Sequence, residues 1–287
     1  MSLALGTAQF GSRYGVANRQ GEITVNEGAA ILTLARAHGI DTLDTAISYG
    51  DSEQRLGELG VSDWRVVSKL PAAPASCTDM AGWVEAEVVA SLGRLEVPHL
   101  EGLLLHRPAQ LCEPGGEGLW RALERLKTLG FVRKIGISIY EPSELKNIVG
   151  RVPVDLVQAP LNVLDRRLVD SGWLARLASA GVEVHARSVF LQGLLVMPSA
   201  TRPAHFAKWA WLLGTYDAWV EESGRTPMQA CLGYVLAIPE INRVVIGVDS
   251  AAQLEDLLRV APVQDPPPNE IRCDDAELVN PSRWAQL

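Results

Sequence analysis

IDTLDTAISYG, residues 40–50, joins a short apolar run to two side chains that can carry chemistry. The run ends at Asp44, and Tyr49 follows within the same turn. A short apolar run bounded by polar residues is typical of a buried strand. We therefore expect a strand at residues 42–44, with an acid and a phenol beyond its carboxyl end.

Two more strand-like runs end in the same way. Lys69 ends the run at residues 64–68, and His106 ends the run at residues 103–105. Neighbouring strands lie about 5 Å apart, and the carboxyl ends of parallel strands share one edge of a sheet. If the sheet is parallel, an acid, a phenol, an amine and an imidazole meet there, which predicts a proton-transfer site.

Strand-like and helical patterns alternate along all 287 residues. Eight strands are predicted, each followed by at least one helix. An α/β fold of the (β/α)8 or TIM barrel type fits this count better than a doubly wound sheet, which usually has fewer strands. We predict a single domain over residues 1–287, with a Pro-rich tail from about residue 261. The predicted strands are 3–5, 42–44, 65–68, 102–105, 134–137, 156–158, 183–186 and 243–246, and the predicted helices are 25–38, 52–59, 78–95, 118–129, 142–149, 169–178, 203–222, 226–237 and 251–260.

The composition argues against several classes of function. The net charge is −8 without a Lys/Arg cluster, which disfavours nucleic acid as a partner. No apolar run is long enough to cross a bilayer and no signal peptide is evident, so we expect a cytoplasmic protein with no membrane partner. The four cysteines form no CxxC pair, so we expect reduced thiols and no bound metal.

The four strand-end side chains suit proton donation to a carbonyl oxygen. The Tyr49 phenol is a weak acid, and a nearby Lys69 ammonium is expected to lower its pKa. A buried Lys needs a counter-charge, which Asp44 supplies. His106 is expected to donate a hydrogen bond to the substrate oxygen or to pass a proton. Because none of the four supplies a hydride, a cofactor is implied.

Each of the four also has an ordinary structural alternative. Asp44 could cap a helix, Lys69 could reach solvent from a strand end, His106 could be a core histidine, and Tyr49 could pack within a loop. Their regular placement at successive strand ends makes chance a poor explanation for the set.

These residues resemble the motifs of the aldo-keto reductases over nearly the full length of the chain. Residues 43–57 are similar to the family's Asp-Thr-Ala-x-x-Tyr-Gly-x-Ser-Glu motif, and residues 5–11, Leu-Gly-Thr-Ala-Gln-Phe-Gly, to its opening strand and turn. Residues 68–71 and 104–108 look like the lysine and histidine strands. The resemblance implies that Tyr49 is the general acid, that Lys69 and Asp44 tune it, and that His106 positions the carbonyl.

The resemblance also implies a nicotinamide cofactor extended across the barrel mouth. Ile139 departs from the family pattern, because an Asn usually holds the carboxamide there. Arg187 stands where the family often has an aromatic, and is expected to hold phosphate or to cover the nicotinamide ring. Phe190 either lines the pocket or belongs to the core. The implied cofactor-binding residues are Gly6, Thr7, Asp44, Ser138, Gln158, Arg187, Ser188, Phe190, Gln192, Gly193, Gly247, Asp249, Ser250, Gln253 and Asp256.

The loop at residues 246–256 bears on the choice between NADP(H) and NAD(H). Family members often grip the 2′-phosphate of NADP with Lys or Arg here, and this loop has neither. A phosphate beside Asp249 is unfavourable, whereas a ribose 2′-hydroxyl suits it; the alternative is that Asp249 only caps the last helix. NADP(H) remains the first expectation on family frequency, with NAD(H) as the alternative.

Substrate contacts are expected from loops at the barrel mouth. Tyr14, Tyr140 and Trp284 are candidate pocket walls, and Arg107 is a candidate partner for an anionic group. The alternatives are ordinary packing for the aromatics and a solvated ion pair for Arg107.

The sequence thus predicts NAD(P)H-dependent reduction of an aldehyde or ketone, with Tyr49 as the acid. The expected partner is a small carbonyl substrate, and the expected assembly is a monomer or small homo-oligomer. A non-catalytic nucleotide-binding regulator or redox sensor on the same barrel is the main alternative, and a nicotinamide-free isomerase or lyase is the third.

Overall fold

Eight parallel strands close into a barrel in a computed structural model that describes residues 2–19 and 21–286. Residues 1, 20 and 287 of the predicted domain lie outside the described residues. Each strand pairs with its neighbours in chain order, and β1 pairs with both β2 and β8, so the barrel has no free edge. The strands are β1 (Ser2–Gly6), β2 (Thr42–Asp44), β3 (Arg65–Leu70), β4 (Leu100–Leu105), β5 (Val132–Ser138), β6 (Leu156–Pro160), β7 (Glu183–Arg187) and β8 (Arg243–Gly247).

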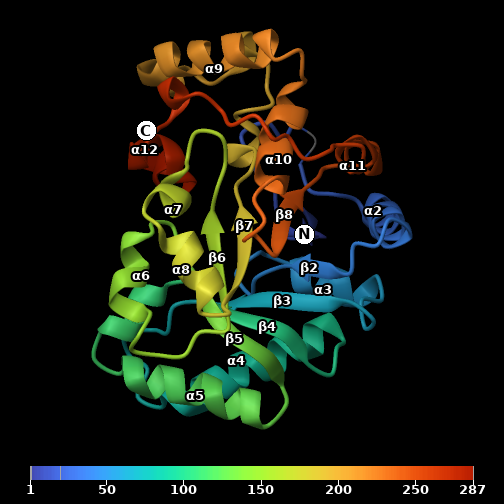
Figure 1. Ribbon diagram of the computed structural model, residues 1–287. Helices are drawn as coiled ribbons and strands as arrows, with labels where there is room; N and C mark the ends of the chain where they lie inside the picture. The colour runs from blue at the N-terminus through green and yellow to red at the C-terminus, as the bar shows by residue number, and fades with distance from the viewer. Residues whose placement is uncertain (1, 20, 287) are drawn as a thin grey trace.

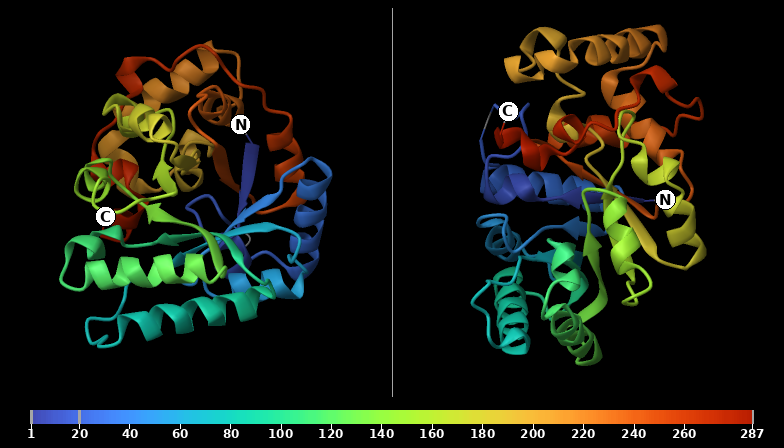
Figure 2. Two further views of the ribbon diagram at one scale, coloured as in Figure 1. Left: turned by 60° about the horizontal axis from the view of Figure 1, so that its bottom comes forward. Right: turned by 90° about the vertical axis from the view of Figure 1, so that its left-hand side faces the viewer.

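Helices surround the strands, as Figures 1 and 2 show. In Figure 1, α4 and α5 lie at the bottom, α2 and α11 on the right, and α6 and α8 on the left. The α-helices are α1 (Ala8–Gly11), α2 (Val25–Ala37), α3 (Ser52–Glu58), α4 (Met80–Leu95), α5 (Gly116–Thr128), α6 (Ser143–Ile148), α7 (Arg167–Asp170), α8 (Trp173–Ser179), α9 (Ala210–Glu222), α10 (Pro227–Leu236), α11 (Ala251–Leu258) and α12 (Ala276–Val279). Short 3₁₀ helices are η1 (Pro108–Cys112), η2 (Leu191–Gly193), η3 (Ser199–Thr201), η4 (Ala204–Trp209), η5 (Asn269–Ile271) and η6 (Pro281–Gln286).

The predicted barrel and its eight strands are confirmed, whereas some helices differ from the sequence pattern. The helix predicted at residues 169–178 is two helices, α7 and α8, because Gly172 between them has φ +73°. The helix predicted at residues 203–222 begins as the 3₁₀ helix η4 and continues as α9. The tail, which showed little periodicity, contains η5, α12 and η6.

Local sequence explains where the principal helices begin. Thr24, Thr226 and Ser250 each accept a hydrogen bond from the backbone N–H three residues later, which caps α2, α10 and α11. Gln229 completes a capping box with Thr226. The strands are apolar on both faces because helices cover them outside and side chains fill the barrel inside.

The turn that carries Tyr49 packs directly against the turn after β1. A Cβ atom on Gly11 would lie 2.0 Å from the Tyr49 carbonyl oxygen and 2.3 Å from the Ser52 nitrogen. Gly50 has φ +54°, and a Cβ there would lie 2.2 Å from the Gly11 oxygen. Both positions therefore exclude side chains, and the contact fixes Tyr49 relative to β1.

The Ser-Glu pair that follows Tyr49 is structural. Ser52 Oγ donates to the Thr7 carbonyl oxygen at 2.8 Å. The buried Glu53 carboxylate accepts from Ser68 and Ser91 and forms an ion pair with Arg94 at 2.7 Å. Glu53 thus ties α3 to β3 and α4, and its buried charge is fully partnered.

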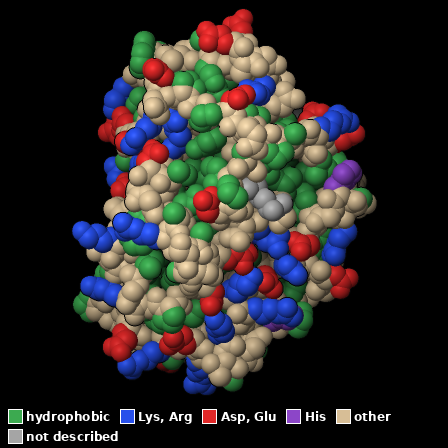
Figure 3. All heavy atoms as spheres, viewed as in Figure 1, with side chains coloured by type: hydrophobic (Ala, Val, Ile, Leu, Met, Phe, Trp, Pro, Cys, Tyr) green, Lys and Arg blue, Asp and Glu red, His purple; other side chains and the backbone are tan. Residues whose placement is uncertain are grey.

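The surface carries charges of both signs. On the face shown in Figure 3, acidic and basic side chains lie close to one another, and hydrophobic side chains gather in the upper centre. Among the described residues, no helix has both the length and the apolar character needed to cross a membrane.

Gly11→Ala is expected to destabilise the protein by about 1–3 kcal/mol, because the turns that meet at Gly11 must separate. Gly214→Ala is the matched control: it lies inside α9, and a Cβ there meets no atom within 4 Å. That control should stabilise by about 0.5–1 kcal/mol. Urea denaturation measures both, and an equal effect of the two substitutions would contradict the packing argument.

Candidate active site

A buried ion pair joins the carboxyl ends of β2 and β3. Lys69 Nζ lies 2.8 Å from Asp44 Oδ2 and also donates to the Thr45 carbonyl oxygen at 2.8 Å. The two residues are 1% and 4% exposed, so solvent screens the pair little. Burial lowers the pKa of Lys69, while Asp44 opposes that shift. The two sequence-predicted residues therefore form one unit.

Tyr49 lies beside this pair, in the turn after β2. Lys69 Nζ is 5.0 Å from the centroid of the Tyr49 ring, and the His106 ring meets it edge-on at 5.9 Å between centroids. The pKa of the Tyr49 phenol is raised, chiefly by burial and then by Asp44, and Arg187 opposes the shift. The pKa shift is upward overall, so burial and Asp44 outweigh the lowering that was expected from Lys69.

His106 follows β4 at the edge of the same group. Burial, together with the positive charges of Lys69 and Arg187, lowers the pKa of His106 to about 4. The imidazole is therefore neutral near pH 7, which suits a hydrogen-bond donor rather than an acid. Ser48 Oγ lies 3.3 Å from His106 Nδ1. If this hydroxyl donates to Nδ1, the ring carries its proton on Nε2.

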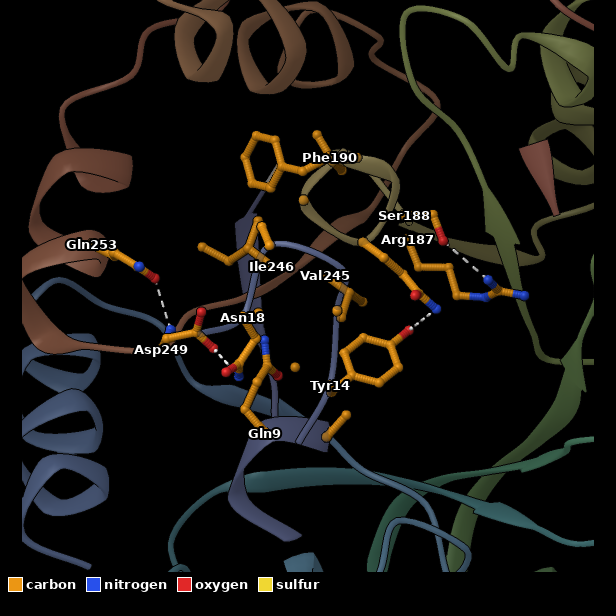
Figure 4. A pocket seen from close by; sticks show the side chains of 18 of the residues that line it. Gln9, Tyr14, Asn18, Arg187, Ser188, Phe190, Val245, Ile246, Asp249 and Gln253 are labelled. Carbon is orange, nitrogen blue, oxygen red and sulfur yellow. Dashed lines mark hydrogen bonds between the residues drawn. The ribbon is translucent and has the colours of Figure 1, made fainter. Parts of the chain in front are cut away.

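A groove of about 360 Å³ opens beside Asp44 and Tyr49, within the size range of small-molecule sites. Figure 4 shows Arg187 and Ser188 on one side of it and Asp249 and Gln253 on the other. Many residues predicted to contact cofactor or substrate line this groove: Gly6, Thr7, Tyr14, Asp44, Tyr49, Arg187, Ser188, Phe190, Gln192, Gly193, Gly247, Asp249 and Gln253.

A buried acceptor beneath the groove fits a nicotinamide carboxamide. Ser138 and Gln158 are paired across β5 and β6, and Gln158 Nε2 donates to Asp44 Oδ1 at 2.6 Å. Gln158 Oε1 is buried and has no partner among the described residues. A buried acceptor without a donor is costly, so an amide N–H there would be stabilising. Ile139 offers no polar contact to a carboxamide, because its side chain is a hydrocarbon, and that side chain is fully buried.

The loop after β7 has an unusual backbone. Ser188, Leu191 and Gln192 have φ values of 60°, 48° and 52°. Residues other than glycine rarely adopt this left-handed backbone conformation, and such strain concentrates at functional sites. The Gln192 carbonyl accepts from the Val16 N–H at 3.0 Å, so the loop leads from β7 toward the residues that follow β1.

The opposite end of the groove carries a carboxylate. Asp249 Oδ1 accepts from Asn18 Nδ2 at 3.1 Å, and the Asp249 N–H donates to Gln253 Oε1 at 2.8 Å. Burial raises the pKa of Asp249, and the Asn18 bond opposes that shift. Ser250 caps α11 through the Gln253 N–H, so the cap belongs to Ser250 rather than to Asp249.

Several predicted contacts lie away from the groove lining. Asp256 is exposed and pairs with Arg259, and Arg107 pairs with Glu113. Trp284 packs edge-on against Phe206 at 4.8 Å and donates to the Leu278 carbonyl, so it belongs to the core of the tail. Ser138, Gln158, Ser250, Lys69, His106 and Tyr140 also stand outside the lining, although Tyr140 contacts Arg187, which lines it.

Gln9 and Asn18 are groove residues that sequence reasoning missed. Gln9 is buried within α1, and a Cβ on Gly247 would lie 2.5 Å from its Nε2. Asn18 is buried and bonds Asp249 from 231 residues away. Their position in the segment directly after the first strand, where a barrel carries its binding loops, is the signal that could have identified them.

A model of the aldo/keto reductase family matches residues 2–270. An L-galactose dehydrogenase of Arabidopsis thaliana is 28% identical over 274 residues, which cover 89% of this chain and 82% of that protein. An aldo-keto reductase of Mycolicibacterium vanbaalenii is 29% identical over 136 residues, 45% of this chain and 47% of the relative.

Solved structures agree on the fold. An aldo-keto reductase of Bacillus halodurans in its holo form superposes with a TM-score of 0.74 at 20% identity, covering 94% of this chain and 90% of that chain. A glycerol dehydrogenase of Gluconobacter oxydans gives 0.66 at 21% identity, with coverages of 91% and 87%. With the family model spanning nearly the whole chain, the protein belongs to the aldo/keto reductase family and is a nicotinamide-dependent oxidoreductase.

Proposed function

We propose that the protein interconverts an aldehyde or ketone with its alcohol, and that Tyr49 is the proton donor in the direction of reduction. The observation that carries this proposal is the buried Lys69–Asp44 pair, at 2.8 Å, beside the Tyr49 ring. The relative named for L-galactose is a dehydrogenase, which supports carbonyl–alcohol chemistry in this part of the family.

Each side chain has a distinct task in the proposed reaction. A bound dihydronicotinamide supplies the hydride. The neutral His106 imidazole donates a hydrogen bond from Nε2 to the substrate oxygen, and Ser48 orients the ring through Nδ1. The Tyr49 phenol, whose pKa is raised, keeps its proton until charge develops on that oxygen. Lys69 then stabilises the phenolate, and Asp44 keeps Lys69 charged despite burial.

We further propose that the cofactor is NAD(H). Of the described residues that line the groove, the charged ones are Asp44, Arg187 and Asp249, so the one cation among them lies at the Tyr49 end. Burial and the Asn18 bond account for the pKa shift of Asp249, with no contribution from a neighbouring cation. A 2′-phosphate at this end would meet a carboxylate, whereas a ribose hydroxyl could donate to it. Family frequency, which favours NADP(H), is the opposing consideration.

Tyr49→Phe should lower kcat/KM for carbonyl reduction by about 10²–10⁴-fold, the range for loss of a general acid. Tyr234→Phe is the control, because Tyr234 lies on α10 outside the groove. Absorbance of the reduced nicotinamide measures turnover, and calorimetry of cofactor binding shows whether the variant site is intact. A Tyr49→Phe enzyme as active as the parent would show that Tyr49 is not the proton donor.

Reduction and oxidation should differ in their dependence on pH. Tyr49 donates in reduction, so reduction should stay level from about pH 6 to about pH 9 and fall only near the raised phenol pKa. Alcohol oxidation needs the deprotonated phenol and should therefore rise with pH over the same interval. Initial rates in both directions test this. A fall in reduction centred near neutral pH is the contrary result.

The parent should bind NADH more tightly than NADPH. Asp249→Asn should lower the ratio of the NADPH to the NADH dissociation constant about tenfold, because it removes one negative charge near the proposed position of the 2′-phosphate. Glu255→Gln is the matched control: it changes the same charge on exposed α11 outside the groove. Calorimetric dissociation constants for both nucleotides decide the question. Tighter NADPH binding by the parent would reject the assignment of NAD(H).

A further inference from the structure

Arg187 is a half-buried cation at the end of β7 with no carboxylate partner in the described ranges, 2–19 and 21–286. Its Nη2 donates to the Ile139 carbonyl oxygen at 2.8 Å, and its Nη1 donates to Ser188 Oγ at 3.1 Å. The guanidinium carbon lies 4.4 Å from the centroid of the Tyr140 ring. Within the described part of the chain, no Asp or Glu forms an ion pair with it.

An unpaired cation in a partly buried pocket is unfavourable by itself. Asp44, an acid of the groove lining, is already paired with Lys69 and bonded to Gln158. The bonds that Arg187 makes are to neutral oxygens, and they leave N–H groups of the guanidinium free to donate. The groove therefore presents a fixed positive charge that a ligand anion can satisfy.

The guanidinium is held at one end of the groove, by the Ile139 carbonyl and the Tyr140 ring. Its charge acts on the protonation of Tyr49, Lys69 and His106, so it lies near all three. It reaches Ile139, just beyond β5, and β5 pairs with β4, the strand that His106 follows. Figure 4 places Arg187 across the groove from Asp249.

The loop that follows Arg187 leads in another direction. Its Gln192 carbonyl bonds the Val16 N–H, and a Cβ on Gly193 would lie 2.5 Å from the Ala17 Cβ. The backbone of this loop therefore approaches the residues after β1, toward Asn18 and Asp249. If a dinucleotide follows this loop, the Arg187 side chain remains at the Tyr49 end of the groove, open to a substrate.

We propose that Arg187 is a specificity-determining residue that binds a carboxylate or phosphate carried by the carbonyl substrate. Tyr140 supports the guanidinium from one face, and the Tyr14 ring lines the groove on the same side, with its hydroxyl accepting from Gln192. The substrate class is thus an anionic aldehyde, ketone or corresponding alcohol. This inference rests on the proposed carbonyl–alcohol chemistry.

Matched substrates test the anion site. Succinic semialdehyde is compared with butanal, and glyceraldehyde 3-phosphate with glyceraldehyde, so that the two pairs separate carboxylate from phosphate. The parent should favour the anionic member of at least one pair about tenfold or more in kcat/KM. Arg187→Gln should reduce the ratio of kcat/KM for the anionic over the neutral substrate about 10- to 100-fold. Arg187→Lys keeps the charge but loses the planar guanidinium, so it should retain part of this preference.

Binding without turnover provides an independent measure. Calorimetry of succinate and of inorganic phosphate, with the protein saturated in cofactor, should show an affinity that Arg187→Gln weakens by a similar factor. The thermal unfolding midpoint of each variant shows whether loss of the Arg187 bond to the Ile139 carbonyl destabilises the protein. An unchanged midpoint assigns the weaker binding to loss of the anion contact itself.

Three results would overturn the proposal. They are equal kcat/KM within both substrate pairs, an anionic preference that survives Arg187→Gln, and a variant whose cofactor affinity falls while the substrate ratio is unchanged. The last would assign Arg187 to the cofactor. Failure to turn over any carbonyl with either nucleotide would instead reject the proposed function, and the calorimetric arm would still decide whether Arg187 binds anions.

Discussion

The buried Lys69–Asp44 ion pair is the constraint on which the site depends. Two charges removed from water are tolerated only when each is paired and its remaining hydrogen bonds are satisfied. Lys69 meets this requirement through Asp44 and the Thr45 carbonyl, and Asp44 through Lys69 and Gln158. The pair therefore fixes the ends of β2, β3 and β6 relative to one another, and Tyr49 is held above strands that cannot shift independently.

The charges around Tyr49 determine which protonation state the site favours. Burial and Asp44 raise the pKa of the phenol and outweigh the positive charges nearby. Arg187 is the positive charge that lowers it. A phenol that holds its proton is suited to reduction. An anion bound at Arg187 would reduce the opposing effect of that cation, so substrate binding and proton retention by Tyr49 reinforce one another.

The sequence could predict what depends on local pattern. Strands with apolar runs and polar ends identified the barrel and the position of Asp44, Lys69 and His106, because a parallel sheet brings strand ends to one edge. It could not predict the pairing of Asn18 with Asp249, which joins the loop after β1 to the loop after β8. The sequence also could not predict the position of Trp284, because the contact of its ring with Phe206 depends on how the tail folds back onto the barrel. The direction of the Tyr49 pKa shift depends on burial, which a motif does not encode.

Ile139 and Arg187 depart from the family pattern at two separate positions of the sequence, but a hydrogen bond joins them in the structure. An Asn at position 139 would offer its side chain to the carboxamide, whereas the Ile139 side chain is fully buried and leaves only its backbone carbonyl on the polar side. That carbonyl accepts from Arg187 at 2.8 Å, and the adjacent Tyr140 ring supports the same guanidinium. A phenyl ring at position 187 would have no donor for this carbonyl, whereas the guanidinium has several, so the cation and the apolar residue suit each other. Under the proposed function, Gln158 Oε1, which has no partner among the described residues, remains open to the carboxamide, and Arg187 adds a positive charge to the groove lining that Tyr49 shares.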